Sequence, residues 1–476
     1  MKMHGWVLLA ALSYSGVAAA QRAEALGPEV RRVLRLTAPR VILEHVQIID
    51  GTGAPPSPDR NIVIEGGKIT AISPGADQSP AEGTAILDLR GHSVMPGIVG
   101  MHNHLYFMAR PNLKPDGDYE GPTIRLEMTF SAPRMYLANG VTTMRTTGSV
   151  DPYAELNLKQ SIERGAVPGP HLDVTGPYLD GSGNNPEEAR QTVAYWADRG
   201  VTSFKAYKHI TREELNAAVK EAHKRGLKVT GHLCSVTYEE AAEIGIDNLE
   251  HGFFVNTALD PGKKPDTCTE TGGDYTLEHI NPREADRLIA TLIQHHVAIT
   301  STLPGTAASL DGQPPLRAAV LQAMSPAVRD GVLYGRNRAV NPSARANRAR
   351  LLRREMDLER AFVAAGGLLL AGADSVGFSG NIPGFGDQRE IELLVDAGFT
   401  PVQAIRIATL NGATFLGRQE RIGSIATGKN ADLIVVKGDP ATRIADIENV
   451  EIVFKDGVGY DPGKLLDSVK GHYGEY

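Results

Sequence analysis

The chain has 476 residues, enough for a large hydrophobic core and more than one domain. Its net charge of -7 and pI near 6.1 come with acidic and basic residues interspersed, and no Lys/Arg run resembles a nucleic-acid-binding surface. Aromatic residues make up 6 % of the chain, whereas Gly (51) and Pro (29) are plentiful. This composition argues against a coiled coil or a disordered tail and favours many elements joined by tight turns. We therefore expect no nucleic-acid partner.

The first 20 residues have the pattern of a secretory signal peptide. A short basic start containing Lys2 precedes an apolar stretch from Trp6 to Val17, and small residues end the segment at Ala20. The apolar stretch is too short to span a bilayer stably, although an uncleaved anchor is the alternative. We expect cleavage after Ala20 and a periplasmic or secreted protein without a stable membrane anchor.

Both ends of the chain are rich in short strand patterns punctuated by Gly, Asp and Pro. The patterns near the N-terminus cover residues 41–49, 61–65, 68–72 and 85–89, and those near the C-terminus cover residues 433–436 and 450–455. Neither end alone has enough strands for a stable sheet. We therefore predict that residues 21–95 and 422–476 form one small, discontinuous β-sandwich domain.

The middle of the chain, residues 96–421, alternates short apolar strands with helical patterns. Such alternation is typical of βα units around a parallel sheet. Eight strands are expected, at residues 94–104, 141–147, 171–176, 201–208, 228–233, 248–252, 298–302 and 368–375. Eight repeats predict a closed (β/α)8 TIM barrel with its site at the C-terminal strand ends. The alternative is an open doubly wound sheet, but no Gly-x-Gly-x-x-Gly follows an early strand.

Two connections in this region are too long for simple crossovers. Residues 253–282 follow the sixth strand, and residues 303–367 follow the seventh. Insertions on this face of a barrel can shape substrate access or form a subunit interface, so a homo-oligomer is possible. The two cysteines are Cys234 and Cys268, and an oxidising compartment permits a disulfide that the sequence alone does not establish.

Metal-binding residue types lie at the predicted ends of several barrel strands. His102 and His104 are separated by one residue, so in a strand both imidazoles point to the same face. Later strands end at Lys205, His232, His251 and Asp374. Each alone has an ordinary structural explanation, such as a core histidine, a surface lysine or a helix cap. Together they predict a site for two divalent metal ions.

Four stretches resemble the amidohydrolase superfamily, in particular its imidazolonepropionase-like and prolidase-like branch. These stretches are residues 94–104, 249–252, 400–413 and 423–433. The resemblance extends over nearly the whole mature chain and includes the split β domain.

The resemblance implies a role for each strand-end residue. His102 and His104 would bind one metal ion together with Asp374, and His232 and His251 would bind the second. Lys205 would carry a CO2-derived carbamate (N6-carboxylysine) that bridges the two ions. We expect both ions to be zinc. The ions would lower the pKa of a bridging water to give hydroxide near neutral pH. Asp374 would serve as general base and then as general acid.

The same resemblance implies hydrolysis of an amide bond, with a dipeptide or an N-acyl amino acid as the expected substrate. The alternatives are an ester, lactone or phosphotriester hydrolase on the same site, and a non-catalytic binding protein on the same fold. The chain departs from the branch where His232 stands alone at the fifth strand, and where Arg145 lacks the usual following aspartate. Arg145, Tyr178 and Tyr207 are candidate substrate contacts, each with a purely structural role as its alternative.

Overall fold

The computed structural model describes residues 25–75, 82–109, 112–113, 119–120, 123–181, 185–308, 310, 314–337 and 342–475. The predicted signal peptide, residues 1–20, lies outside the described residues. Over the described ranges, no helix is both long and apolar enough to cross a membrane.

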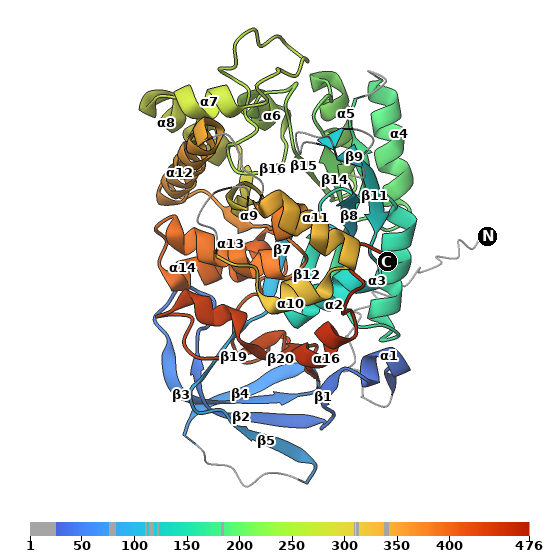
Figure 1. The fold of residues 1–476 in the computed structure, drawn as a ribbon, viewed down its shortest axis with the longest axis vertical. Helices are drawn as coiled ribbons and strands as arrows, with labels where there is room; N and C mark the ends of the chain where they lie inside the picture. Colours follow the sequence, from blue (N-terminus) through green and yellow to red (C-terminus); the bar gives the residue numbers. More distant parts are fainter. Residues whose placement is uncertain are drawn as a thin grey trace, which may run out of the picture.

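Eight parallel strands form the barrel that the sequence predicts, and they follow one another in chain order (Figure 1). The strands are β7 (Ile98–Asn103), β12 (Val141–Thr146), β13 (His171–Leu179), β14 (Ser203–Ala206), β15 (Lys228–Gly231), β16 (Asn248–Glu250), β17 (Ala298–Ser301) and β18 (Leu369–Ala371). The ring closes where the last strand returns to the first. There the His102 carbonyl accepts the N–H groups of Ala373 (3.1 Å) and Asp374 (2.9 Å). Closure therefore sets Asp374 beside the histidines of β7.

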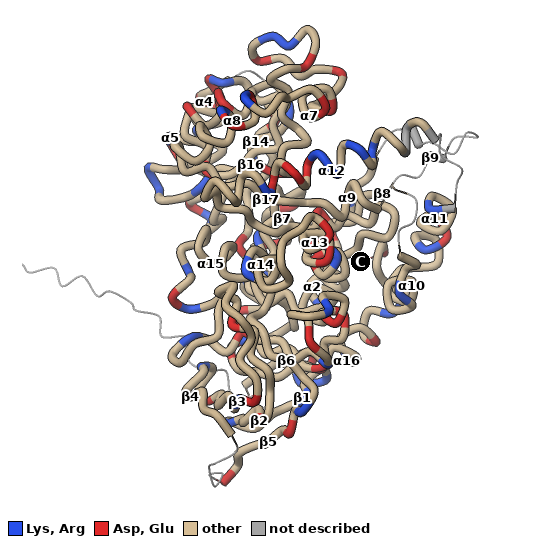
Figure 2. Tube along the Cα trace, turned by 90° about the vertical axis from the view of Figure 1, so that its left-hand side faces the viewer, with Lys and Arg blue, Asp and Glu red and all other residues tan. Residues whose placement is uncertain are grey.

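Helices between the strands cover the outside of the barrel. They are α2 (Ser131–Ala138), α3 (Pro152–Glu163), α4 (Pro186–Ala197), α5 (Arg212–Lys224), α6 (Tyr238–Ile244), α8 (Pro282–Gln294), α13 (Phe385–Asp396), α14 (Pro401–Arg406), η3 (Ile407–Asn411) and α15 (Gly412–Phe415). Thr211 and Thr237 start α5 and α6 as capping boxes with Glu214 and Glu240, which satisfies backbone N–H groups at each helix start. Basic and acidic residues are interspersed along the described chain (Figure 2), in agreement with its mixed charge.

The chain ends combine into a second sheet of nine strands, at one end of the molecule's long axis (Figure 1). Its strands are β1 (Leu34–Leu36), β2 (Arg40–Ile48), β3 (Ser57–Glu65), β4 (Lys68–Pro74), β5 (Thr84–Asp88), β6 (His92–Pro96), β19 (Leu433–Lys437), β20 (Val450–Lys455) and β21 (Val458–Tyr460). β6 pairs antiparallel with β19, which joins the two ends of the chain. Hydrogen bonds thus link all nine strands continuously. Leu43, Ile62, Val94 and Phe454 lie in the sheet's own hydrophobic core.

An ion pair joins the sheet to the barrel. His171 at the start of β13 lies 3.1 Å from Asp456 in the β20–β21 turn. Within the barrel part of the chain, Arg418 after α15 pairs with Asp173 of the same strand at 2.6 Å. His171, Asp432 and Asp456 are close enough together to hold a metal ion. However, the Lys455 ammonium lies 3.8 Å from Asp456 and already supplies positive charge. We interpret this group as a joint between the two parts of the molecule.

The remaining elements are a hairpin beyond β7, a second short strand pair and the other helices. A hairpin of β8 (Tyr106–Ala109) and β11 (Ile124–Glu127) follows β7, with β9 (Asn112–Leu113) and β10 (Tyr119–Glu120) pairing beyond it. The remaining helices are α1 (Pro28–Arg31), α7 (Asp274–His279), α9 (Leu303–Ala307), α10 (Ala318–Ala323), α11 (Pro326–Asn337), α12 (Pro342–Ala364), η2 (Phe378–Gly380), η4 (Ile444–Glu448) and α16 (Pro462–Asp467). The long connection after β17 therefore folds largely as helices α9 to α12.

A disulfide between Cys234 and Cys268 fastens the connection after β16 to the end of β15. The Cys234 carbonyl also accepts hydrogen bonds from Thr257 Oγ1 (2.7 Å) and Lys263 Nζ (3.0 Å). The insertion is thus held beside His232 by one covalent bond and by two hydrogen bonds to the same carbonyl.

We expect Cys268→Ser to lower the free energy of unfolding by about 3 kcal/mol, because the bridge closes a 34-residue separation that the unfolded chain would otherwise explore. Urea unfolding with and without reductant would measure this. Reduced parent protein should match the variant, and Thr267→Ser is the neighbouring control. Equal stability of oxidised parent and variant would contradict the expectation.

Candidate metal centre

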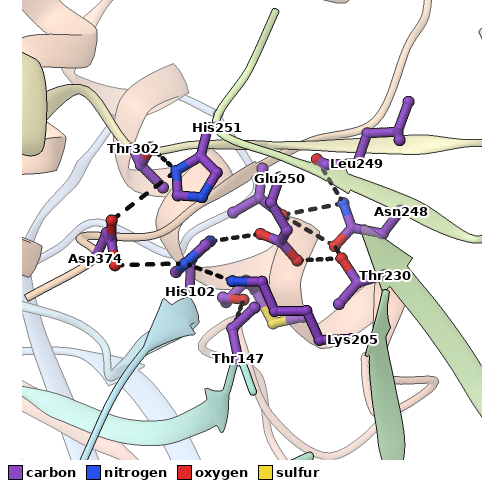
Figure 3. Close-up of polar contacts among 12 residues, drawn as sticks. His102, Thr147, Lys205, Thr230, Asn248, Leu249, Glu250, His251, Thr302 and Asp374 are labelled. Carbon is purple, nitrogen blue, oxygen red and sulfur yellow. Dashed lines mark hydrogen bonds and ion pairs between the residues drawn. The ribbon is translucent and has the colours of Figure 1, made fainter. Parts of the chain in front are cut away.

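Two histidines and one aspartate converge where the barrel closes. His104 Nε2 lies 3.1 Å from Asp374 Oδ1. His102 Nε2 lies 3.5 Å from the same oxygen (Figure 3). Both imidazoles are buried, while the Asp374 side chain is 30 % exposed. Two nitrogens and one carboxylate oxygen at these separations can serve as ligands of one divalent ion.

The second histidine pair continues the group across the barrel. The ring of His251 lies 4.5 Å from that of His102 and 4.4 Å from that of His232, centroid to centroid. His251 Nδ1 contacts Thr302 Oγ1 at 3.0 Å, whereas its buried Nε2 has no hydrogen-bond partner among the described residues. A buried imidazole nitrogen with a free lone pair is suited to a metal ion.

Unusual backbone conformations place two of these residues. Asp374 and His251 have φ values of 48° and 65°, in the left-handed region that non-glycine residues seldom occupy. The conformations persist because the adjoining N–H groups are held: Asp374 N donates to His102 O, and Gly252 N donates to Thr300 O at 2.8 Å. Such residues cluster at functional sites, where the surrounding structure enforces them.

Lys205 completes the set that the sequence predicts. Its Nζ lies 3.3 Å from His102 Nε2, and the side chain is almost fully buried. Burial lowers the pKa of this amine to about 8, although the nearby Glu250 and Asp374 charges oppose the shift. Across the described residues, no ion pair joins the Lys205 amine to a carboxylate. The amine is therefore partly neutral near neutral pH.

The electrostatics of the site suit ligands for a cation. Burial lowers the pKa values of His102, His104 and His232, so these imidazoles are neutral at physiological pH. Burial alone would raise the pKa of Asp374, but the surrounding histidines hold it well below its usual range. Neutral imidazoles and an ionised carboxylate are the protonation states that bind metal ions.

Glu250 is a functional residue that the sequence analysis missed. Its Oε2 accepts a hydrogen bond from His102 Nδ1 at 2.7 Å, which leaves His102 Nε2 free to face the centre (Figure 3). A carboxylate behind a ligating histidine fixes its tautomer and increases its basicity. Glu250 directly precedes His251 in the sequence, and its position next to a predicted metal ligand could have identified it as a candidate.

Arg145 does not lie where a substrate contact would, contrary to one sequence-based hypothesis. It is 1 % exposed, and its guanidinium donates to Glu250 Oε1 and the Met101 carbonyl, both at 2.6 Å. The side chain lies inside the barrel, below the histidines, and neutralises the charge of Glu250. Its role is therefore structural.

Three tyrosines, which we call the tyrosine rim, adjoin the histidines. Tyr106 packs 4.6 Å from His104 and Tyr207 packs 5.0 Å from His232, centroid to centroid. Tyr178 links the two, since its hydroxyl lies 2.8 Å from that of Tyr106 and its ring 5.0 Å from that of Tyr207. Burial raises the pKa of all three phenols, so they remain neutral hydrogen-bonding groups.

Two buried glutamates hold the backbone behind the site, and a third lies beside them. Glu355 accepts from Phe253 N at 2.7 Å, Glu390 accepts from Leu303 N at 2.9 Å, and Glu359 lies beside them. Burial raises the pKa of all three carboxyls, and that of Glu359 to about 8. These carboxyls stay protonated in the folded protein at pH values where the same groups in the unfolded chain have lost their protons.

We therefore expect stability to fall as pH rises from about 4.5 to about 8, by roughly 1.4 kcal/mol per pH unit for each retained proton. Glu359→Gln, which cannot ionise, should show a shallower fall in its urea midpoint over this range. Asp357→Asn, on the exposed side of α12, is the control and should follow the parent. A Glu359→Gln variant with the parent's pH profile would contradict the assignment.

Glu250→Gln tests the contact behind His102. An amide keeps the shape of the carboxylate but not its charge, so we expect metal affinity to fall about tenfold to a hundredfold. Competition with a chromogenic chelator would measure the affinity, with Glu213→Gln on exposed α5 as the control. Parent-like affinity in Glu250→Gln would show that the charge is not needed.

Comparisons with known proteins agree with this geometry. Residues 93–459 match the family model described as the amidohydrolase family. A Xaa-Pro dipeptidase solved with methionine in its active site shares 22 % identity over 89 % of this chain and 100 % of its own, with a TM-score of 0.64. A. niger ochratoxinase shares 16 % identity over 92 % of this chain and 99 % of its own, with a TM-score of 0.64. Bottromycin amidohydrolase shares 20 % identity over 94 % of this chain and 96 % of its own, with a TM-score of 0.66. No curated protein matches the chain significantly. At these identities the structural likenesses establish the fold.

Proposed function

The chain belongs to the amidohydrolase family and is a hydrolase of carbon–nitrogen bonds, and from this premise we propose that it cleaves the amide bond of a dipeptide or an N-acyl amino acid. The observation that carries the proposal is the convergence of His102, His104 and Asp374 beside Lys205. A second pair of histidines adjoins this group.

We propose that the site holds two divalent ions, the first on His102, His104 and Asp374 and the second on His232 and His251. Imidazole and carboxylate ligands at a buried site favour zinc. When bound, such ions acidify a water molecule and polarise the carbonyl of the scissile bond.

Lys205 would bridge the two ions as a carbamate. Its neutral amine would add CO2 and release one proton, so that an uncharged amine becomes an anionic carbamate with two oxygens. The position of the amine supports this step, because an ammonium 3.3 Å from a metal-binding nitrogen would repel the metal.

Asp374 would move the proton during hydrolysis. Its Oδ1 faces His102 and His104, whereas its Oδ2 lies 4.0 Å from His251 Nδ1. The Asp374 side chain is 30 % exposed, so a water molecule can reach it. We assign to Oδ2 the acceptance of a proton from the attacking water and its delivery to the leaving nitrogen.

Lys205→Ala tests the bridged centre. Metal analysis of parent protein purified without chelator should give close to two ions per chain, falling to one or fewer in the variant. Formate, a small carboxylate that fits the space of the carbamate, should restore part of the metal content. Lys228→Ala, a barrel lysine at the opposite strand end, is the control. A metal content that Lys205→Ala leaves unchanged would rule out the carbamate bridge.

Hydrolysis is assayed on N-acyl amino acids and dipeptides together with matched esters, lactones and phosphotriesters. Cleavage of the amides supports the proposed substrate class. Activity confined to the other compounds would favour the alternative hydrolase, and metal-free, inert protein would favour a binding function.

We also propose that the protein acts in the periplasm or outside the cell, where a disulfide such as Cys234–Cys268 persists. A mature N-terminus at Gln21 would support this location, and an intact N-terminus would oppose it.

A further inference from the structure

Arg125 is an exposed cation beside the candidate metal centre whose charge the proposed chemistry does not use. It lies on β11, which pairs with β8 directly after the His102–His104 segment, with Arg125 opposite Met108. Its guanidinium carbon lies 5.1 Å from the Tyr178 ring centroid and 5.7 Å from that of Tyr106. The hairpin thus places a positive charge on the tyrosine rim.

The position of Arg125 relative to Lys205 fits the length of a small substrate. Lys205 Nζ lies 5.5 Å from the Tyr178 centroid, so the two cationic groups are no more than about 11 Å apart. One amino-acid residue spans roughly 3.5 Å. Arg125 is therefore within reach of a substrate that extends by one or two residues from an amide at the metal ligands.

The charge of Arg125 is not neutralised by the part of the chain that the structure describes. Its contacts there are the two aromatic rings, and no carboxylate in the described ranges forms an ion pair with it. Other arginines near the barrel are paired, as Arg212 is with Asp266 and Arg418 with Asp173. A guanidinium that lies on aromatic rings and forms no ion pair with the described residues is suited to bidentate binding of a carboxylate.

We propose that Arg125 determines specificity by binding the free carboxylate of the amino-acid portion of the substrate. This inference rests on the proposed amide hydrolysis and adds to it the requirement for an anionic group next to the scissile bond. Lys208 is the competing candidate, since its Nζ lies 5.7 Å from the Tyr207 ring. Lys208 contacts Tyr207, the tyrosine beside His232, whereas Arg125 contacts Tyr106 and Tyr178.

The test compares N-acetyl-L-leucine with N-acetyl-L-leucinamide, which differ only in the carboxylate, by acetate release from metal-loaded protein. The readout is the ratio of their kcat/KM values. We expect Arg125→Ala to lower this ratio about tenfold to a hundredfold, mainly through KM of the free acid. Arg125→Glu should lower it further, because a like charge repels the carboxylate. Metal content and thermal unfolding equal to the parent's identify folded variants.

Lys208→Ala is the matched control and should keep the parent's ratio. An unchanged ratio in Arg125→Ala, or an equal fall in Lys208→Ala, would overturn the assignment of Arg125. If the parent cleaves neither compound, the proposed hydrolysis fails separately. Calorimetry with L-leucine and L-leucinamide then decides the role of Arg125. A selective loss of L-leucine affinity in Arg125→Ala supports it, and equal affinities contradict it.

Discussion

The hydrogen bond between His102 Nδ1 and Glu250 Oε2 is the contact on which the candidate metal centre depends. Both side chains are completely buried, and a buried carboxylate costs several kcal/mol unless it is paired. Arg145 supplies that pairing from the next barrel strand. One carboxylate therefore ties β7, β12 and β16 together across the barrel interior. It also holds His102 in the tautomer that leaves Nε2 available.

Closure of the barrel adds the second constraint. His102 and Asp374 are far apart in sequence, but the carbonyl of one accepts the backbone N–H of the other. The side chain of His102 is thus oriented by Glu250, and the backbone carbonyl of His102 positions Asp374. Any loss of closure would separate the carboxylate from both histidines of β7.

Much of this arrangement could be predicted because it follows from one-dimensional features of the sequence. Alternating strand and helix patterns predicted all eight barrel strands, and the strand ends contained the residues that the structure brings together. Depth within the barrel could not be predicted. Arg145 occupies an inward position in β12, and the pattern does not show whether an inward side chain lies above or below the site.

Glu250 was missed for a different physical reason. Side chains alternate between faces along a strand, so residues 250 and 251 should point in opposite directions. His251 instead has φ of 65°, which ends the alternation and lets both neighbours face the centre (Figure 3). Arg125 escaped notice because it lies in an insertion outside the barrel, where no strand-end rule applies.

The locations of these residues separate chemistry from recognition. The candidate ligand residues project from closely hydrogen-bonded strand ends, and Glu250 behind them is buried and hydrogen-bonded to both His102 and Arg145. Tyr106 of the tyrosine rim and the neighbouring Arg125 come from a hairpin that forms its own two-stranded sheet. A side-chain change on that hairpin can alter which substrate is held without disturbing the buried network, because the two share no hydrogen bond among the described residues. A substitution at Glu250, in contrast, would disturb the histidine itself and affect every substrate alike.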